Sequence, residues 1–163
     1  MGNFVSAANV SEMKGSGSVS AQESVVSLRF SDTVVAYTIL RVSFGLNIML
    51  HGVSRLLAGH AAFLTYLNHY FEKTSIIPAS SLPAFASVLP WVETTLGLLL
   101  VLGIATRFSL IVGAIVITCL VIGTNLAQDW VVSGLQLIYA FLYYYLLAHF
   151  KENLLSVDGV LHR

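Results

Sequence analysis

Four stretches of the chain are apolar over roughly the twenty residues that a helix needs to cross a bilayer. They cover about residues 33–58, 82–105, 108–126 and 131–149. Only 10% of all residues are charged, well below the roughly 25% of soluble domains. The sequence therefore predicts an all-α integral membrane protein, a four-helix bundle formed by residues 33–163. The lipid bilayer is one expected partner, and the net charge of zero argues against nucleic acid as another.

The links between these stretches predict how the helices are arranged. The second and third links are so short that the helices they join must be antiparallel neighbours. The first link, residues 59–81, is longer, and its aromatic and leucine side chains recur at helical spacing. It therefore predicts an amphipathic helix at the membrane interface. The residues on which this depends are Phe63, Tyr66, Leu67 and Tyr70.

Basic residues predict the orientation of the bundle. Five of them share the side that holds both termini and the turn between the second and third helices. By the positive-inside rule we expect both termini in the cytoplasm and residues 59–81 outside. These basic residues are Lys14, Arg29, Arg107, Lys151 and Arg163.

Residues 1–32 form a separate polar segment, rich in serine, glycine and alanine. No run in it is apolar enough to span a membrane. It also lacks the basic start, apolar core and small-residue cleavage site of a signal peptide. We expect a tail that is mobile or becomes ordered on a partner.

The first apolar stretch carries polar residues on one side. At 100° per residue, Arg41, His51 and Arg55 lie within about 80° of one another on a helix. Such groups are costly in hydrocarbon and should face protein or a water-filled cavity. Counting depth at ~1.5 Å per residue places Arg41 level with Glu93 of the next stretch, so we expect an ion pair between them. Fixing the helix register is the alternative role for that pair.

Further polar residues gather toward the outer side of the predicted bundle. Asn47, His51 and Arg55 approach the outer surface in turn, and Gln136 and Tyr139 share a face of the last stretch. The sequence predicts a pocket that opens outward, has the Arg41–Glu93 pair as its floor and has residues 59–81 as its lid. Alternatively, His51 caps an interfacial network and Arg55 is an interfacial anchor.

The predicted pocket divides into two sets of candidate residues. Candidate catalytic residues are Glu93, His51 and Arg41, because carboxylate and imidazole groups transfer protons and a guanidinium attracts anions. Candidate substrate-binding residues are Arg55, Asn47, Gln136 and Tyr139.

Several chemistries find no matching pattern in the sequence. His51 and His149 lie at different expected depths, so they do not form a pair of haem ligands. No cluster has metal-ligand spacing, and no phosphate-binding loop is present. Cys119 is the single cysteine, and it cannot form a dithiol within the chain. No haem, metal or nucleotide is therefore expected.

An ordered set of short motifs runs through the chain. The first stretch contains Leu40-Arg41, Gly45, His51-Gly52 and Arg55. The second contains Glu93, Gly97 and Gly103, and Thr106-Arg107 follows it. Ser156-Val157-Asp158 lies near the end. This set, over about residues 33–160, resembles the DoxX family of small four-helix bacterial and archaeal membrane proteins, in which Lys is common at the position of Arg55 and the late motif is Ser-Leu-Asp-like.

The resemblance implies a location in the inner membrane of a bacterium or archaeon and suggests a redox role. Family members resemble a subunit of thiosulfate:quinone oxidoreductase. The resemblance thus implies the membrane subunit of a quinone-linked oxidoreductase, with a quinone as cofactor and a small sulfur compound as substrate. Two alternatives stay open: a non-catalytic accessory or scaffold subunit of a larger membrane complex, and a carrier for a small anion or lipid. For both the oxidoreductase subunit and the accessory subunit, we expect other protein subunits as partners.

Overall fold

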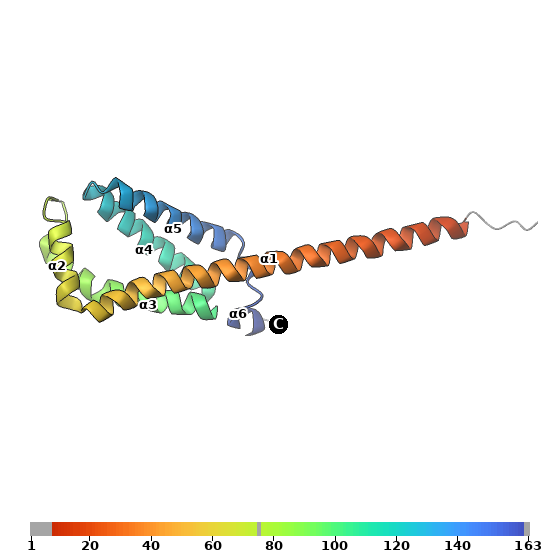
Figure 1. The fold of residues 1–163 in the computed structure, drawn as a ribbon, viewed down its shortest axis with the longest axis horizontal. Helices are drawn as coiled ribbons and strands as arrows, with labels where there is room; N and C mark the ends of the chain where they lie inside the picture. Colours follow the sequence, from red (N-terminus) through yellow and green to blue (C-terminus); the bar gives the residue numbers. More distant parts are fainter. Residues whose placement is uncertain (1–7, 75, 162–163) are drawn as a thin grey trace, which may run out of the picture.

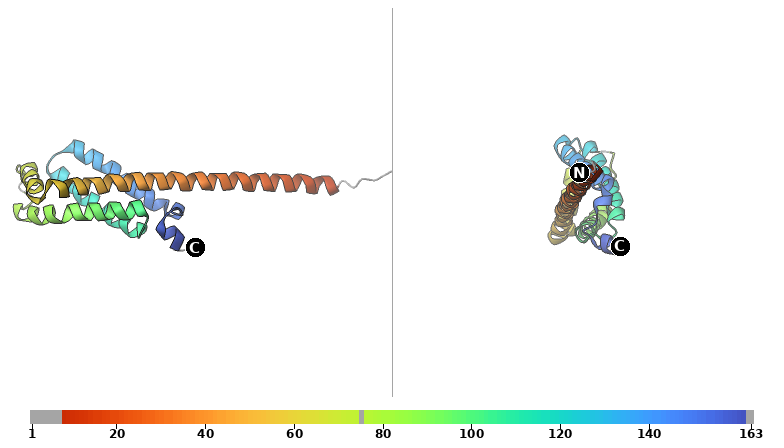
Figure 2. Two further views of the ribbon diagram at one scale, coloured as in Figure 1. Left: turned by 60° about the horizontal axis from the view of Figure 1, so that its bottom comes forward. Right: turned by 90° about the vertical axis from the view of Figure 1, so that its right-hand side faces the viewer.

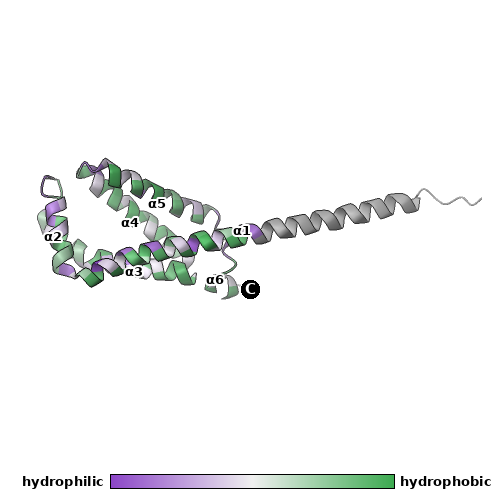
Figure 3. Ribbon diagram, in the orientation of Figure 1, coloured by the Kyte–Doolittle hydropathy of each residue, from purple (hydrophilic) through white to green (hydrophobic). Residues whose placement is uncertain are grey.

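The computed structural model describes residues 8–74 and 76–161, with side chains from residue 32 onward, and this part of the chain is helical without strands (Figure 1). The elements are α1 (Ala8–Ala58), α2 (His60–Tyr70), η1 (Ala79–Ser81), α3 (Leu82–Leu102), α4 (Thr106–Leu126), α5 (Trp130–Ala148), η2 (Phe150–Glu152) and α6 (Val157–Leu161). Apolar residues predominate on the bundle helices (Figure 3).

Four helical segments are long and apolar enough to cross a membrane. They are Asp32–Ala58, Ala79–Leu102, Thr106–Leu126 and Trp130–Ala148. The prediction of an all-α, four-helix integral membrane protein is confirmed, and each span begins and ends within three residues of its predicted bounds. Contact with the lipid bilayer follows from these spans.

Helix α1 begins at Ala8 and so extends well before the first span. Its 51 residues correspond to ~76 Å of helix, and Figures 1 and 2 show it running past the rest of the molecule. The backbone of the predicted tail is therefore helical from Ala8 on, while residues 1–7 lie outside the described part. The mobility of the tail and the boundary at residue 32 stay predictions.

The bundle consists of two helix pairs. Helix α1 packs mainly on α3, and α4 packs mainly on α5. Figure 1 shows α2 at one end of the bundle, where the two pairs are furthest apart. We call this the α2 end. Phe44 of α1 joins the pairs through an edge-to-face contact with Tyr143 of α5, with ring centroids 4.7 Å apart.

Glycines bring α1 and α3 into backbone contact. A Cβ atom on Gly97 would lie 2.3 Å from the backbone nitrogen of Met49, and one on Gly52 would lie 2.5 Å from the carbonyl oxygen of Pro90. Because backbone atoms cannot yield as a flexible side chain does, small residues are required here. This close contact fixes how far α1 and α3 can slide along each other.

Replacing Gly97 with alanine should push α1 and α3 apart and lower the free energy of unfolding by about 1–3 kcal/mol. Denaturant titration in mixed micelles measures this loss. The matched control is Gly134→Ala on α5, because a Cβ atom there meets no atom within 4 Å. Equal stability of the two variants would show that α1 and α3 are not in backbone contact at Gly97.

Arg41 is buried at the end of the bundle opposite α2. Its side chain is 2% exposed and donates hydrogen bonds to the carbonyl oxygens of Leu100, Val101 and Leu155. The first two belong to the last turn of α3, whose carbonyls lack partners within the helix. A guanidinium at this end also complements the negative pole of the helix dipole.

The C-terminal segment completes this structure. The carboxylate of Asp158 accepts hydrogen bonds from the backbone nitrogens of Ala105, at 2.9 Å, and Thr106, at 2.7 Å. It thereby caps the start of α4, where negative charge is favourable. Gly103, at φ 69°, leaves room for Arg41, because a Cβ atom there would lie 2.7 Å from Nη1. The segment Ser156-Val157-Asp158 therefore stabilises the turn between α3 and α4 through these hydrogen bonds.

The predicted Arg41–Glu93 ion pair is wrong. The expected depths assumed that the first two spans end at the same level. The 27-residue first span is ~40 Å long, whereas the 21-residue α3 is ~31 Å long. The glycine contacts place Gly52 beside Pro90 and Thr94, so that Arg41 reaches only the last turn of α3.

Candidate functional site

Glu93 forms its ion pair with Arg55, through the Oε2 and Nη1 atoms. The Glu93 side chain is 9% exposed and the Arg55 side chain 28%. The Arg55 guanidinium also lies over the ring of Phe63 from α2, 5.1 Å from its centroid, a favourable cation–π geometry. The pair thus neutralises both charges within the membrane-spanning part of the bundle.

This pair borders a cavity of about 380 Å³ between the two helix pairs, which we call the polar cavity. Its polar and aromatic lining groups come from α1, α3 and α5: His51, Arg55, Glu93, Gln136, Tyr139 and Tyr143. Leucine, isoleucine and valine side chains form the remaining walls. Leu135 and Ile138 on its rim are themselves exposed, so the cavity adjoins the lipid-facing surface.

Three lining groups can donate hydrogen bonds into the polar cavity. Within the described residues, the hydroxyls of Tyr139 and Tyr143 and the amide nitrogen of Gln136 have no acceptor. The amide oxygen of Gln136 is already used, because it accepts from the Thr124 hydroxyl at 2.8 Å. That bond orients the amide, and its NH₂ group remains available to a ligand.

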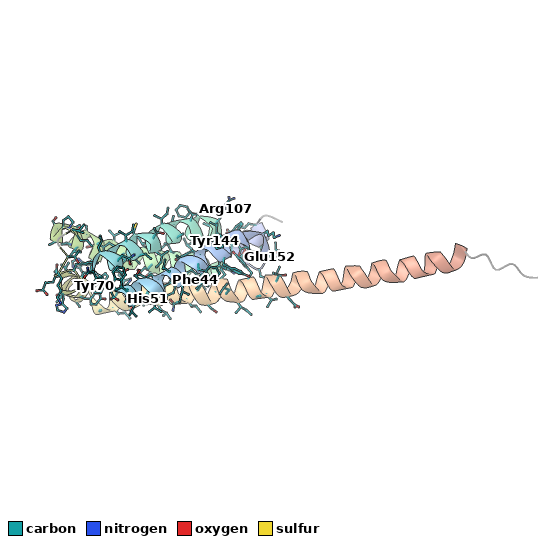
Figure 4. The ribbon with its side chains drawn as sticks, turned by 90° about the horizontal axis from the view of Figure 1, so that it is seen from above. Phe44, His51, Tyr70, Arg107, Tyr144 and Glu152 are labelled. Atoms are coloured by element: carbon teal, nitrogen blue, oxygen red, sulfur yellow. The ribbon has the colours of Figure 1, made fainter. Side chains whose placement is uncertain are left out.

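His51 lies at the rim of the polar cavity. Its imidazole is exposed and meets the ring of Tyr139 edge-on, with centroids 6.4 Å apart. Figure 4 shows His51 between Tyr70 at the α2 end and Phe44 deeper in the bundle. An exposed imidazole that lines the same cavity as a buried carboxylate is suited to passing protons between the surface and the cavity.

Five of the predicted site residues come together and two do not. Glu93, His51, Arg55, Gln136 and Tyr139 all line the polar cavity, although their chemical roles stay predictions. Arg41 lies at the other end of α3, as described above. Asn47 is exposed outside the cavity, because it lies ~40° further around α1 than His51 and so faces away.

Two further residues shape the cavity. Tyr143 is 3% exposed and lines the cavity beside Gly113 of α4. A Cβ atom on Gly113 would lie 2.4 Å from the Tyr143 ring, so this glycine provides the space for the tyrosine. The spacing of Tyr143 with Gln136 and Tyr139 on one helix face was the available sequence signal. Gly113 forms a small-xxx-small pair with Ser109, a pattern that indicates a helix contact without naming its partner.

Helix α2 exists as predicted, with Phe63 and Leu67 buried on one face, but it does not cover the polar cavity. It covers a second cavity of about 530 Å³ between α2, α3 and α4, which we call the apolar cavity. The lid prediction for the polar pocket is therefore wrong. The two helix pairs diverge enough that the bundle holds two adjoining spaces.

The far end of α2 is tied to the α4–α5 turn. The Tyr70 hydroxyl donates to Asp129 at 2.9 Å, and the Thr74 hydroxyl donates to the carbonyl of Leu126 at 3.3 Å. Burial, and then the hydrogen bond to Asp129, raise the pKa of Tyr70 above its usual value. Tyr70 therefore stays protonated as a donor, and α2 bridges both helix pairs.

A protein-bound metal ion needs several ligating side chains close together. Across residues 32–74 and 76–161, whose side chains the structure describes, no three histidine, cysteine, aspartate or glutamate side chains are grouped to hold a metal ion. The polar cavity instead offers hydrogen-bond donors, one ion pair and apolar walls. Such a lining suits an organic molecule with acceptor oxygens.

Comparison with known proteins gives one match. The DoxX family model matches residues 36–130, which run from the first span to the start of α5. No curated protein and no solved structure matches the chain. The matched range is shorter than the expected 33–160 and leaves out the Ser156-Val157-Asp158 motif, but it covers more than half of the chain. This protein therefore belongs to the DoxX family.

Proposed function

We propose that this protein is the quinone-binding membrane subunit of an oxidoreductase that acts on a small sulfur compound such as thiosulfate. The observation that carries the proposal is the polar cavity, in which the Glu93–Arg55 pair lies beside the free donors of Gln136 and Tyr139. Its volume is within the usual range for small-molecule sites, and its apolar walls suit a ring.

The cavity residues fit a quinone. When bound, a quinone accepts two electrons and two protons to form the quinol, and joining two thiosulfate ions through a new sulfur–sulfur bond supplies the two electrons. Tyr139 and Gln136 would hold the acceptor oxygens by donating hydrogen bonds. Glu93 would hold a proton at its carboxylate, and His51 at the rim would exchange protons with the surroundings.

We expect the sulfur substrate to bind to a partner subunit rather than in the polar cavity. Arg55 is already paired with Glu93, so the polar cavity offers little net attraction for a doubly charged anion. The chain has a single cysteine and therefore no dithiol to pass electrons. We expect a second subunit to bind the sulfur compound and to deliver electrons to the cavity.

Thiosulfate-dependent reduction of a short-chain quinone by the protein with its partners tests the proposal. Tyr139→Phe should raise the KM for the quinone about fivefold while the fold is kept, because one hydrogen bond of ~1 kcal/mol is lost. The matched control is Tyr144→Phe, since Tyr144 is 67% exposed on the same helix. A complex that neither binds quinone nor oxidises a sulfur anion would refute the proposal.

A second candidate function is that of a non-catalytic accessory subunit. Helix α1 extends beyond the bundle and offers a surface on which another protein can pack. A mild-detergent pull-down from native membranes, with mass spectrometry of proteins and extracted quinones, separates the two functions. A large assembly without stoichiometric quinone would favour the accessory role, whereas a soluble oxidoreductase subunit with quinone would favour catalysis.

A further inference from the structure

The polar and apolar cavities adjoin each other. Four residues line both of them: Arg55, Leu120, Val132 and Gln136. A molecule that extends past these side chains would occupy both spaces at once. The two cavities therefore meet at these side chains and differ in the chemistry of their linings.

The apolar cavity suits a hydrocarbon chain. Phe63 comes from α2 and Phe71 directly follows that helix, Phe85 and Leu89 come from α3, and Leu120 comes from α4. Among the described residues of this lining, Arg55 is the one ionic side chain, and Glu93 already neutralises it. A charged or strongly polar occupant would find no counter-charge here, and its desolvation would be costly.

The apolar cavity is also open to the bilayer. Val88 of α3 is 57% exposed, and Cys119 of α4 is exposed, and both line the cavity. Both lie within membrane-spanning helices, so this side of the cavity meets lipid rather than water. A hydrocarbon chain can enter between α3 and α4 without crossing an aqueous phase.

We propose that the apolar cavity holds the hydrocarbon chain of the ligand whose polar head lies in the polar cavity. The inference rests on the proposed function, in which that ligand is a quinone with a long apolar chain. Inside a bilayer the chain gains little by leaving lipid, because both surroundings are apolar. The apolar cavity therefore gives the chain a path, and blocking that path should weaken binding of long-chain ligands only.

Cys119 provides a direct probe of the chain. It is the one cysteine in the protein, and it lines the apolar cavity without lining the polar one. In lipid nanodiscs, a membrane-permeant maleimide should label it, and peptide mass spectrometry follows the rate at this position. The two ligands are a dimethoxy-methyl-benzoquinone with a decyl chain and the same quinone without the chain, and equilibrium dialysis measures their binding.

We expect both quinones to bind and only the decyl form to slow labelling of Cys119, by at least fivefold. If the decyl form binds and the labelling rate does not change, the chain lies elsewhere and the inference is wrong. Equal protection by both quinones would also overturn it, because the chain would then not be required. If neither quinone binds, the proposed function itself fails together with the inference.

A blocking variant gives an independent test. A Cβ atom on Gly123 would lie 3.7 Å from the Phe71 ring, so Gly123→Leu fills the apolar cavity without striking backbone. This variant should bind the decyl quinone about tenfold more weakly and the chain-free quinone within twofold of the unmodified protein. The matched control, Gly134→Leu, has open space around it and should leave both affinities unchanged. Equal loss for both quinones in Gly123→Leu would contradict the inference.

Discussion

Glu93→Gln should reduce quinone turnover at least 100-fold while the protein remains folded in the membrane. Proton transfer by a positioned carboxylate contributes roughly 10²–10⁴ to a rate, and glutamine keeps the shape of the side chain without accepting a proton. The fold should survive because Arg55 is 28% exposed and can be solvated when its partner loses its charge. Turnover measured together with membrane expression level checks both parts of this expectation.

Glu72→Gln is the matched control for this variant. Glu72 is 70% exposed and lies beside His69 on the surface, so the same substitution there should leave turnover and expression unchanged. If Glu93→Gln disappears from the membrane, the Arg55–Glu93 pair is a folding element, as loss of one partner of a buried pair would explain. Full turnover in a well-folded variant would remove Glu93 from the proton path.

Arg41→Met should destabilise the fold by at least about 3 kcal/mol, since three backbone carbonyls each lose a donor worth ~1–3 kcal/mol when buried. The loss occurs where α1, the end of α3 and the C-terminal segment meet. Denaturant titration in mixed micelles measures the free energy of unfolding. Methionine keeps most of the volume, so the effect reports the hydrogen bonds rather than a cavity.

Arg107→Met is the control for Arg41→Met, because Arg107 is exposed at the same end of the bundle (Figure 4). Its stability should stay within about 0.5 kcal/mol of the unmodified protein. An Arg41→Met protein that is fully stable yet inactive would restore the catalytic role that the sequence suggested for Arg41. Together, the two variants distinguish a role of Glu93 in proton transfer from a role of Arg41 in stabilising the end of α3.

Secondary structure and the number of spans were predictable because they depend on local features. A run of apolar residues long enough to cross a bilayer must form a helix, since lipid offers no partners for the backbone. The amphipathic spacing of Phe63 and Leu67 likewise identified α2. The sequence also predicted that one cavity would be lined by Glu93, His51, Arg55, Gln136 and Tyr139. Polar groups in a small membrane bundle have few other places to lie.

The pairing of individual charges depended on the tertiary structure. The sequence by itself determined that Glu93 needs a partner, because a lone carboxylate is costly in a membrane. The register of α1 on α3 decides which arginine pairs with Glu93. That register depends on backbone contact at Gly52 and Gly97. The sequence indicates Gly52 as a helix-contact point, but not which residues of α3 it meets. Counting residues from the helix ends therefore selected Arg41 instead of Arg55. Likewise, the apolar cavity exists because α2 bridges two diverging helix pairs. Only the packing of these pairs determines how far apart they lie.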